Sequence, residues 1–336
     1  MKKFKSKLFR LLGELIVNDP DFSSSLLARY QGWSLLWREG LNQFCRWLGL
    51  PVAYSLTTIG LETSNTCNLR CQHCPVPTDM TRPRGLLAWP LFCRIIDNHP
   101  RIKRIYLTDW GEPLLHPEIV EMVAYAHSRG KHVALTTNGT LLRGEMSRRL
   151  LRSGLDLIKI SIDGGPKTYE KIRHFPYQRL RENLEEFLKL REETGSETWV
   201  EVSMVIYEET MDEVEAFISQ WQGKVDAINF QPRFFTLRRP RRRTCRDLWR
   251  LLVVLWDGRV TPCCADYDGQ LIVGRADEQN LEEIFNGPAM RALRKQHLRK
   301  KWSGLCDQCS FYEADYHLSL KKIRELRKEG KNKKKN

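Results

Sequence analysis

Short β-rich runs that alternate with helical stretches constrain the fold of this 336-residue chain more than any other feature. Helical patterns at 117–129, 144–152 and 179–193 are examples of the segments between the runs. Strands that alternate with helices form parallel sheets with crossover helices. The sequence therefore predicts an α/β fold, a partial (β/α)6 TIM-like barrel. Its six expected strands are 58–63, 104–108, 132–136, 157–162, 199–206 and 227–231.

An N-terminal helical segment precedes this region. Apolar residues from Phe4 to Ile16 share one helical face, and a second helix-rich stretch covers residues 26–48. We expect both stretches to pack on the main domain. Their basic and aromatic residues leave a peripheral membrane contact through the N-terminal helix as an alternative.

The sequence pattern of the C-terminal part is typical of a small α+β domain. The basic stretch 233–246 has the composition of a linker, and Arg233 within it is a candidate contact for an anionic substrate group. Residues 251–263 predict a β-hairpin with an Asp-Gly turn, and residues 281–285 and 289–300 predict helices. The expected parts of the chain are 1–55, 56–235, 236–320 and a basic tail at 321–336.

Ten cysteines and a net charge of +14 bear on chemistry and partners. The basic N-terminus lacks the continuous apolar core of a signal peptide, and no stretch reaches the ~18 apolar residues of a membrane span. We therefore expect a cytoplasmic protein whose reduced thiols can bind metal. The charge suits an anionic partner, such as nucleic acid, a membrane surface or a phosphorylated substrate, although blocks of like charge usually form solvated faces or tails.

Three cysteines, Cys67, Cys71 and Cys74, lie within eight residues. Such a loop can give one thiolate to each of three irons of a four-iron cubane, which leaves the fourth iron open. An open iron lets a small molecule bind the cluster directly. The alternative is a structural zinc site that uses the three cysteines and His73, but zinc sites typically combine one close cysteine pair with a distant second pair.

This spacing after a first strand resembles the hallmark of radical S-adenosylmethionine (AdoMet) enzymes, and the likeness spans residues 55–235. The resemblance implies that Cys67, Cys71 and Cys74 carry a [4Fe-4S] cluster whose open iron binds AdoMet. An electron from the cluster would cleave AdoMet to methionine and a 5'-deoxyadenosyl radical, which removes hydrogen from substrate. The protein would orient and shield these cofactors. A reductase, flavodoxin or ferredoxin would donate the electron.

The same resemblance assigns an AdoMet pocket to loops that share one face of the barrel. Gly111 and Glu112 belong to a segment similar to the family's Gly-Gly-Glu motif, which holds the methionine ammonium, and Trp110 stands where a glycine is common. Ser161 and Arg173 match positions that contact the ribose and the methionine carboxylate in relatives. The expected cofactor-binding residues are His73, Gly111, Glu112, Asn138, Ser161, Asp163 and Arg173.

A second set of cysteines follows residue 236. With the hairpin and helices around them, they resemble the SPASM/twitch auxiliary domain in its shorter twitch form. The resemblance implies that four thiolates cap an auxiliary [4Fe-4S] cluster, which favours electron transfer over substrate binding. Zinc is the alternative occupant. The expected ligands are Cys245, Cys263, Cys306 and Cys309.

Three cysteines have no place in these sets. Cys264 adjoins Cys263, so we interpret it as a spare or alternate ligand. Cys45 and Cys93 lie in apolar helical contexts and are expected to be buried.

Two clusters together predict a radical oxidoreductase, in which the auxiliary cluster accepts the electron left on the substrate. The substrate would be a small molecule or a peptide, with an anionic group as one option. A peptide- or protein-modifying maturase, or a membrane-surface enzyme acting on a lipid or lipid-linked sugar, are alternatives. A non-enzymatic Fe-S or zinc nucleic-acid-binding protein is another, but the basic stretches contain no recognisable recognition module, so nucleic acid is not the expected partner.

Overall fold

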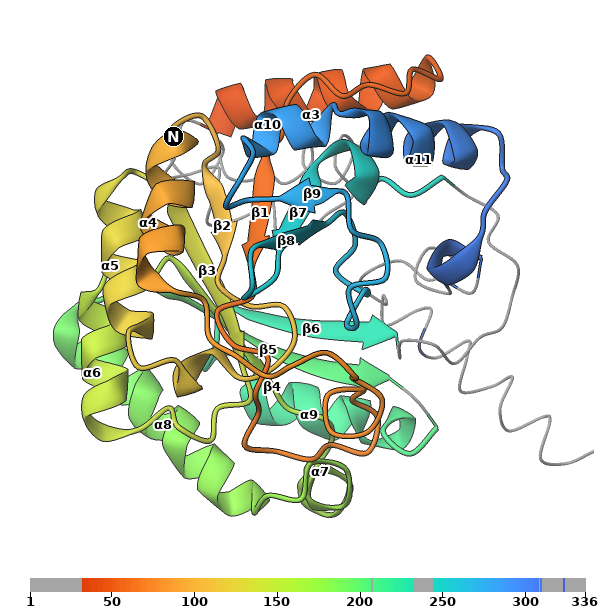
Figure 1. The fold of residues 1–336 in the computed structure, drawn as a ribbon. Coiled ribbons are helices and arrows are strands. Elements are labelled where there is room, and N and C mark those ends of the chain that lie inside the picture. The colour runs from red at the N-terminus through yellow and green to blue at the C-terminus, as the bar shows by residue number, and fades with distance from the viewer. Residues whose placement is uncertain (1–31, 207, 233–243, 308, 310–322, 324–336) are drawn as a thin grey trace, which may run out of the picture.

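Nine strands form one sheet in the computed structural model of the chain, in the order β6-β5-β4-β3-β2-β1-β7-β8-β9. The structure describes residues 32–206, 208–232, 244–307, 309 and 323. Strands β1 to β6 pair with their neighbours in parallel. The sheet curves without closing and carries helices on its outer side (Figure 1). The prediction of a partial barrel is therefore confirmed.

The barrel strands lie within or close to the six predicted runs. Alternate residues point to opposite sides of a strand. In β4, Ile158 and Ile160 belong to the hydrophobic core, whereas Lys159 pairs with Glu201 of β5 across 3.4 Å, from Nζ to Oε2. The strands are β1 (Thr58–Leu61), β2 (Arg104–Tyr106), β3 (His132–Thr137), β4 (Leu157–Ser161), β5 (Trp199–Ile206) and β6 (Ala227–Pro232).

Helices connect these strands and cover the sheet (Figure 1). The predicted helical stretches correspond to α5, α6 and α8 of the barrel and to α10 and α11 of the C-terminal part. Helix α3 begins within the predicted helix-rich stretch 26–48. The helices are α3 (Gly32–Trp47), α4 (Trp89–Asn98), α5 (Ile119–Ser128), α6 (Gly144–Arg152), α7 (Pro166–Arg173), α8 (Tyr177–Thr194), α9 (Val214–Trp221), α10 (Leu281–Phe285) and α11 (Pro288–Leu298).

The C-terminal hairpin extends the barrel sheet. Strands β7 (Leu251–Val254) and β8 (Arg259–Thr261) are antiparallel, as predicted, and Gly258 in their turn has φ +85°. However, β7 also pairs in parallel with β1 over four residues, and the short strand β9 (Gly274–Arg275) follows β8. Pairing with β7 satisfies backbone groups that β1 would otherwise expose at a sheet edge. The hairpin therefore lies in the same sheet as the barrel strands.

Several predictions lie outside the described residues. These are the amphipathic stretch from Phe4 to Ile16, most of the stretch 233–246 with Arg233, and the basic tail 321–336 apart from Ile323. Within the described ranges, none of the helices combines the length and the apolar character needed to cross a membrane.

Candidate active site

The three closely spaced cysteines lie on the loop after β1, at the carboxyl end of the sheet. Cys67, Cys71 and Cys74 are half-buried, and the amide of Cys74 donates to the carbonyl of Cys71 at 3.2 Å. The amide of Gln72 donates to the carbonyl of Ile172 in α7 at 3.0 Å, which ties the loop to the barrel. Burial, and then the charges of Cys71 and Cys67, raise the pKa of Cys74 to about 11. The three thiols therefore lie near one another in a poorly solvated loop.

Arg173, at the end of α7, lies beside this loop. Its guanidinium donates to Asp163 Oδ2 from Nε at 2.9 Å and from Nη2 at 2.7 Å, and Asp163 Oδ1 accepts the amide of Val205 at 2.9 Å. Burial raises the pKa of the Cys71 thiol, while the charge of Arg173 acts to lower it. Burial lowers the pKa of Arg173, but the charges of Asp163 and Cys71 raise it more. A permanently charged group thus lies near Cys71. Asp163, which holds it, comes two residues after Ser161 at the end of β4.

Asn138, after β3, orients Cys67. Asn138 Nδ2 donates to Asn68 Oδ1 at 2.9 Å and lies 3.7 Å from Cys67 Sγ as a weak donor. Asn68 Nδ2 donates to the Thr140 hydroxyl, and that hydroxyl donates to Asn138 Oδ1, both at 2.7 Å. Asn68 and Thr140 were not singled out from the sequence. They complete a closed set of hydrogen bonds that holds Asn138 against the thiol.

Gly111 is in contact with the backbone that leads into the cysteine loop. Its φ is +107°, and an added β-carbon would lie 2.4 Å from Ser64 O and 2.7 Å from Thr66 O. The next amide, of Glu112, donates to Thr66 O at 2.8 Å. A side chain at Gly111 would therefore be strained by its backbone angle and would push the loop away.

The carboxylate of Glu112 is fully engaged with the protein. Oε1 accepts the Thr137 hydroxyl at 2.7 Å and the Leu114 amide at 3.1 Å, while Oε2 accepts the Asn138 amide at 2.8 Å. Burial raises the pKa of Glu112, although these hydrogen bonds lower it. Its charge in turn contributes to the raised pKa of Cys67, after burial. Glu112 thus holds the end of β3 beside the cysteine loop.

A buried ion pair attaches the returning half of this loop to the C-terminal hairpin. Arg82 donates to both carboxylate oxygens of Glu62, and Glu62 Oε2 also accepts the Trp256 amide at 3.2 Å. Arg82 Nε donates to Tyr267 O at 2.6 Å. Asp268 accepts the Arg82 amide at 3.2 Å. The loop is therefore fixed at both ends, by the barrel and by the C-terminal part.

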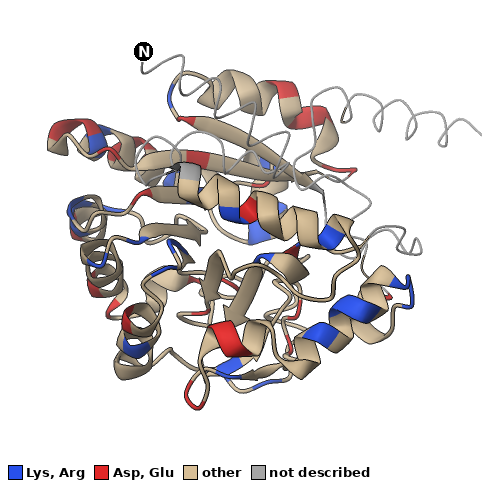
Figure 2. Cartoon of the chain, turned by 90° about the horizontal axis from the view of Figure 1, so that it is seen from above, with Lys and Arg blue, Asp and Glu red and all other residues tan. Residues whose placement is uncertain are grey.

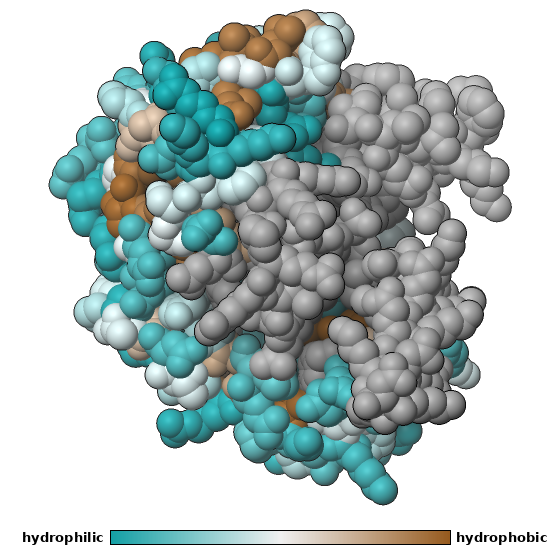
Figure 3. All heavy atoms as spheres, turned by 90° about the vertical axis from the view of Figure 1, so that its right-hand side faces the viewer, coloured by the Kyte–Doolittle hydropathy of each residue, from teal (hydrophilic) through white to brown (hydrophobic). Residues whose placement is uncertain are grey.

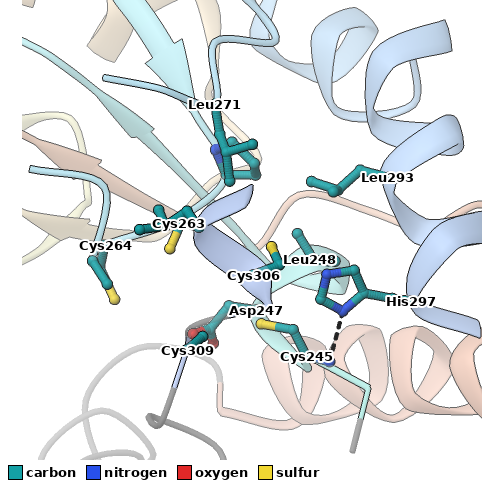
Figure 4. Close-up of a pocket in the computed structure, with 13 residues that line it drawn as sticks. Cys245, Asp247, Leu248, Cys263, Cys264, Leu271, Leu293, His297, Cys306 and Cys309 are labelled. Atoms are coloured by element: carbon teal, nitrogen blue, oxygen red, sulfur yellow. Dashed lines mark hydrogen bonds between the residues drawn. The ribbon is translucent and has the colours of Figure 1, made fainter. Parts of the chain in front are cut away.

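Five cysteines line one pocket in the C-terminal part, together with mostly apolar side chains. In Figure 4 the thiols of Cys245, Cys263 and Cys306 face a shared space, and Cys264 lies to one side. Burial raises the pKa of Cys263 well above its usual value, and the charges of Cys264, Cys245 and Cys309 add to the effect. The four predicted auxiliary ligands thus share one pocket.

His297 is a further residue of this pocket that the sequence did not reveal. The amide of Cys245 donates to His297 Nδ1 at 3.3 Å, so a neutral ring carries its proton on Nε2 (Figure 4). His297 is a buried residue of α11. It fixes the backbone of one predicted ligand, and its isolated position in the sequence gave no signal of this role.

The remaining predicted positions have fewer defined contacts. His73 is half-buried between Cys71 and Cys74. Cys45 and Cys93 are half-buried rather than buried, because each lies at the margin of the core on a helix surface. Among the described residues, no three His, Cys, Asp or Glu side chains are drawn together tightly enough to hold a single metal ion.

Two family models match this chain. The model of the radical SAM superfamily matches residues 61–220, and that of the SPASM iron-sulfur cluster-binding domain matches residues 245–310. The first range contains the cysteine loop and the strand ends around it, and the second contains the five-cysteine pocket.

The chain belongs to the radical SAM superfamily. It is a radical SAM enzyme with a C-terminal SPASM domain, and the cofactors of this class are AdoMet, a [4Fe-4S] cluster and auxiliary iron-sulfur clusters. The donor chemistry of the two sites fits these groups, because partly buried thiols gather in a three-cysteine loop and in an apolar pocket. The zinc and non-enzymatic alternatives are thereby set aside.

Curated relatives of this radical SAM enzyme match over short segments. It is 34% identical over 141 residues to the tungsten-containing aldehyde ferredoxin oxidoreductase cofactor-modifying protein of Pyrococcus furiosus, which is 40% of this chain and 39% of that protein. It is 31% identical over 125 residues to mycofactocin maturase MftC of Mycobacterium tuberculosis, which is 37% of this chain and 30% of MftC. The matches thus span less than half of each relative.

Solved structures share the fold at low sequence identity. Streptococcus suis SuiB bound to precursor peptide SuiA has a TM-score of 0.60 and 12% identity, over 86% of this chain and 78% of SuiB. BtrN in complex with AdoMet and 2-DOIA has a TM-score of 0.55 and 16% identity, over 80% of this chain and all of BtrN. At these identities the likeness concerns the fold alone.

Proposed function

We propose that this radical SAM enzyme oxidises its substrate, and that Cys67, Cys71 and Cys74 hold the catalytic cluster while Cys245, Cys263, Cys306 and Cys309 hold the auxiliary one. When bound, the first cluster supplies the electron that turns AdoMet into a hydrogen-abstracting radical, and the second would take up the electron left on the substrate. The observation that carries the proposal is a second thiol pocket joined directly to the loops of the first site.

The chain's own residues would orient AdoMet beside the cysteine loop. Arg173 lies against Cys71 and offers a guanidinium to a carboxylate, for which its planar geometry is suited. Asp163 holds that guanidinium in place through two hydrogen bonds. Ser161 ends the strand before Asp163 and would contact the ribose. Gly111 would present backbone groups to the ammonium, since its lack of a side chain keeps the motif against the loop.

The carboxylate of Glu112 would act as a positioning group. Its three hydrogen bonds go to the protein, where they fix the turn after β2 and the end of β3. Asn138 would orient Cys67 by its amide. His73 would border AdoMet from within the loop.

The auxiliary pocket supports electron transfer. Four thiols that cap all irons of a cluster leave no position for direct binding of substrate. The pocket is apolar apart from the thiols and a few polar side chains, which suits a buried redox group. This favours net oxidation over a redox-neutral reaction, in which the substrate would give up no electron.

A peptide substrate is a second candidate. The solved structure of SuiB holds a precursor peptide, and MftC is named a maturase. Their similarity to this chain supports testing peptides beside small molecules as substrates.

The test uses anaerobic, reconstituted enzyme with AdoMet, reductant and fractions of small molecules or peptides. Mass spectrometry should find a product that has lost two hydrogens, with one 5'-deoxyadenosine formed for each product. The variant Cys263→Ala should still cleave AdoMet but should lose this product. Product formation by Cys263→Ala at the wild-type rate would contradict the role of the auxiliary cluster.

A further inference from the structure

Helix α3 turns its polar residues toward the protein. Asn42 Nδ2 donates to Ser55 O at 2.8 Å, and Asn42 Oδ1 accepts the Ser55 amide at 3.1 Å. Arg38 Nε donates to Ser55 Oγ at 2.9 Å, and Glu39 accepts the hydroxyl of Thr57. These bonds fix the rotation of the helix about its axis. The opposite face of α3 must therefore point outward.

That outward face is aromatic and apolar. Trp37 and Phe44 lie at i and i+7 on one side of the helix and are 68% and 52% exposed, and Leu48, just after the helix, is 49% exposed. Trp47 is 78% exposed, and its ring stacks on Phe44 at 6.0 Å between centroids. Hydrophobic residues gather where α3 lies, at the upper edge of the face in Figure 3. Large exposed aromatic side chains that are contiguous mark a binding surface more often than chance.

Basic residues lie beside this aromatic stripe. Helix α11 exposes Arg291 and Lys295 at i and i+4, and the exposed residues Arg299, Lys300 and Lys301 follow its end. Residues 287–302 contain neither Asp nor Glu. Seen from above, α3 and α11 share one face of the molecule, and blue basic residues follow α11 (Figure 2). We call the exposed residues from Trp37 to Leu50 together with 291–301 the aromatic-basic face.

The two helices are joined rigidly. Trp249 Nε1 donates to the carbonyls of Leu50 and Val52, just after α3, at 3.2 and 3.1 Å. Asn286, just before α11, exchanges hydrogen bonds of 2.9 and 3.0 Å with the backbone of Ala53. The aromatic stripe and the basic residues therefore keep a fixed relation, as one binding face requires.

We propose that the aromatic-basic face binds the surface of an anionic lipid bilayer. Tryptophan and phenylalanine insert at the boundary between headgroups and acyl chains, and lysine and arginine are attracted to anionic headgroups. A second copy of the chain would bring the basic rows of α11 together, which like charge opposes. Nucleic acid would use the basic residues but leaves Leu48 and Leu50 without a role.

The test is sedimentation of the full chain with vesicles of phosphatidylcholine, with and without phosphatidylglycerol. We expect binding to the anionic vesicles that weakens with salt. Substituting Trp37→Ser together with Trp47→Ser, or Lys295→Gln together with Arg299→Gln, should weaken it on the order of tenfold. Arg148→Gln together with Arg152→Gln removes the same charge from exposed positions of α6 and should bind like the wild type.

Three results would overturn the proposal. One is binding that survives the α3 and α11 substitutions but is lost with Lys5→Gln, Lys7→Gln and Arg10→Gln, which would assign it to the N-terminal segment. Another is absence of vesicle binding with salt-dependent binding of RNA or DNA. The third is absence of vesicle binding with a dimer in sedimentation velocity that Trp37→Ser and Trp47→Ser convert to monomer.

Discussion

The indole N–H of Trp110 donates to the carbonyl oxygen of Cys264 at 3.1 Å, across 154 positions of sequence. Trp110 precedes Gly111 in the loop beside the three-cysteine site, and Cys264 lies in the five-cysteine pocket. The Trp110 ring also meets Tyr267 edge-on, with centroids 5.7 Å apart. Trp110 stands where the related motif commonly has a glycine. Its side chain thus links the loops of the two sites.

Replacement of Trp110 by Phe should keep the ring contact with Tyr267 and remove the hydrogen bond to Cys264. The net loss in unfolding free energy should be about 1 kcal/mol. We also expect a shift in the midpoint potential of the auxiliary cluster, because the backbone next to Cys263 loses a fixed partner. An EPR-monitored redox titration measures the shift. Unchanged potentials of both clusters would contradict a coupling through Trp110.

Replacement of Gly111 by Ala should disturb the cysteine loop. The new β-carbon would lie 2.4 Å from Ser64 O, so the loop must move. Gly195→Ala is the matched control, since Gly195 also has a positive φ, +61°, but open space around it. We expect Gly195→Ala to cost about 1 kcal/mol and to retain iron. Gly111→Ala should in addition lose most of the iron of the first cluster, measured after anaerobic reconstitution.

Replacement of Glu62 by Gln should destabilise the protein by about 3–5 kcal/mol, because it leaves the guanidinium of Arg82 buried without its charged partner. The exposed pair Lys189–Glu193 provides the comparison. Glu193→Gln should change stability by less than about 1 kcal/mol. Urea unfolding of the metal-free proteins measures both values. Equal effects of the two substitutions would show that the Glu62–Arg82 pair does not anchor the loop.

Lys131 predicts a pH dependence of stability. Burial, and then the charge of Lys103, lower the pKa of Lys131 from 10.5 to about 8 in the folded protein. Between these values the unfolded chain binds a proton that the folded protein lacks, so unfolding free energy rises with pH across this window. The rise is at most on the order of 3 kcal/mol. Lys131→Met should lack it, and identical pH profiles of the two proteins would contradict the shift.

Local sequence patterns were sufficient for the six barrel strands, the C-terminal hairpin and helices α5, α6, α8, α10 and α11, and for the clustering of motifs at one end of the sheet. The strand runs alternate in hydrophobicity, and loops that follow parallel strands must meet at their carboxyl ends. Pairing of β7 with β1 could not be predicted in this way, since any apolar strand could have covered that edge. Other contacts between residues far apart in the sequence could not be predicted from local patterns either.

The contacts of the side chains at the site could likewise not be predicted from the sequence. The glycine at position 111 suggested a close backbone approach, but the sequence does not state that the approaching group is Ser64 O. Glu62 and Arg82 carry no motif, and their pairing depends on how the cysteine loop folds back. Such contacts follow from packing in three dimensions and have no periodic signal.

The most direct measurement is 5'-deoxyadenosine formation by anaerobically reconstituted wild-type protein and its Cys71→Ala variant, with iron counted in both. We predict about eight irons and AdoMet cleavage in the wild type, and about four irons and no cleavage in the variant. Cleavage by Cys71→Ala at the wild-type rate, or zinc in place of iron in the wild type, would contradict the central claim that this loop holds the AdoMet-cleaving cluster.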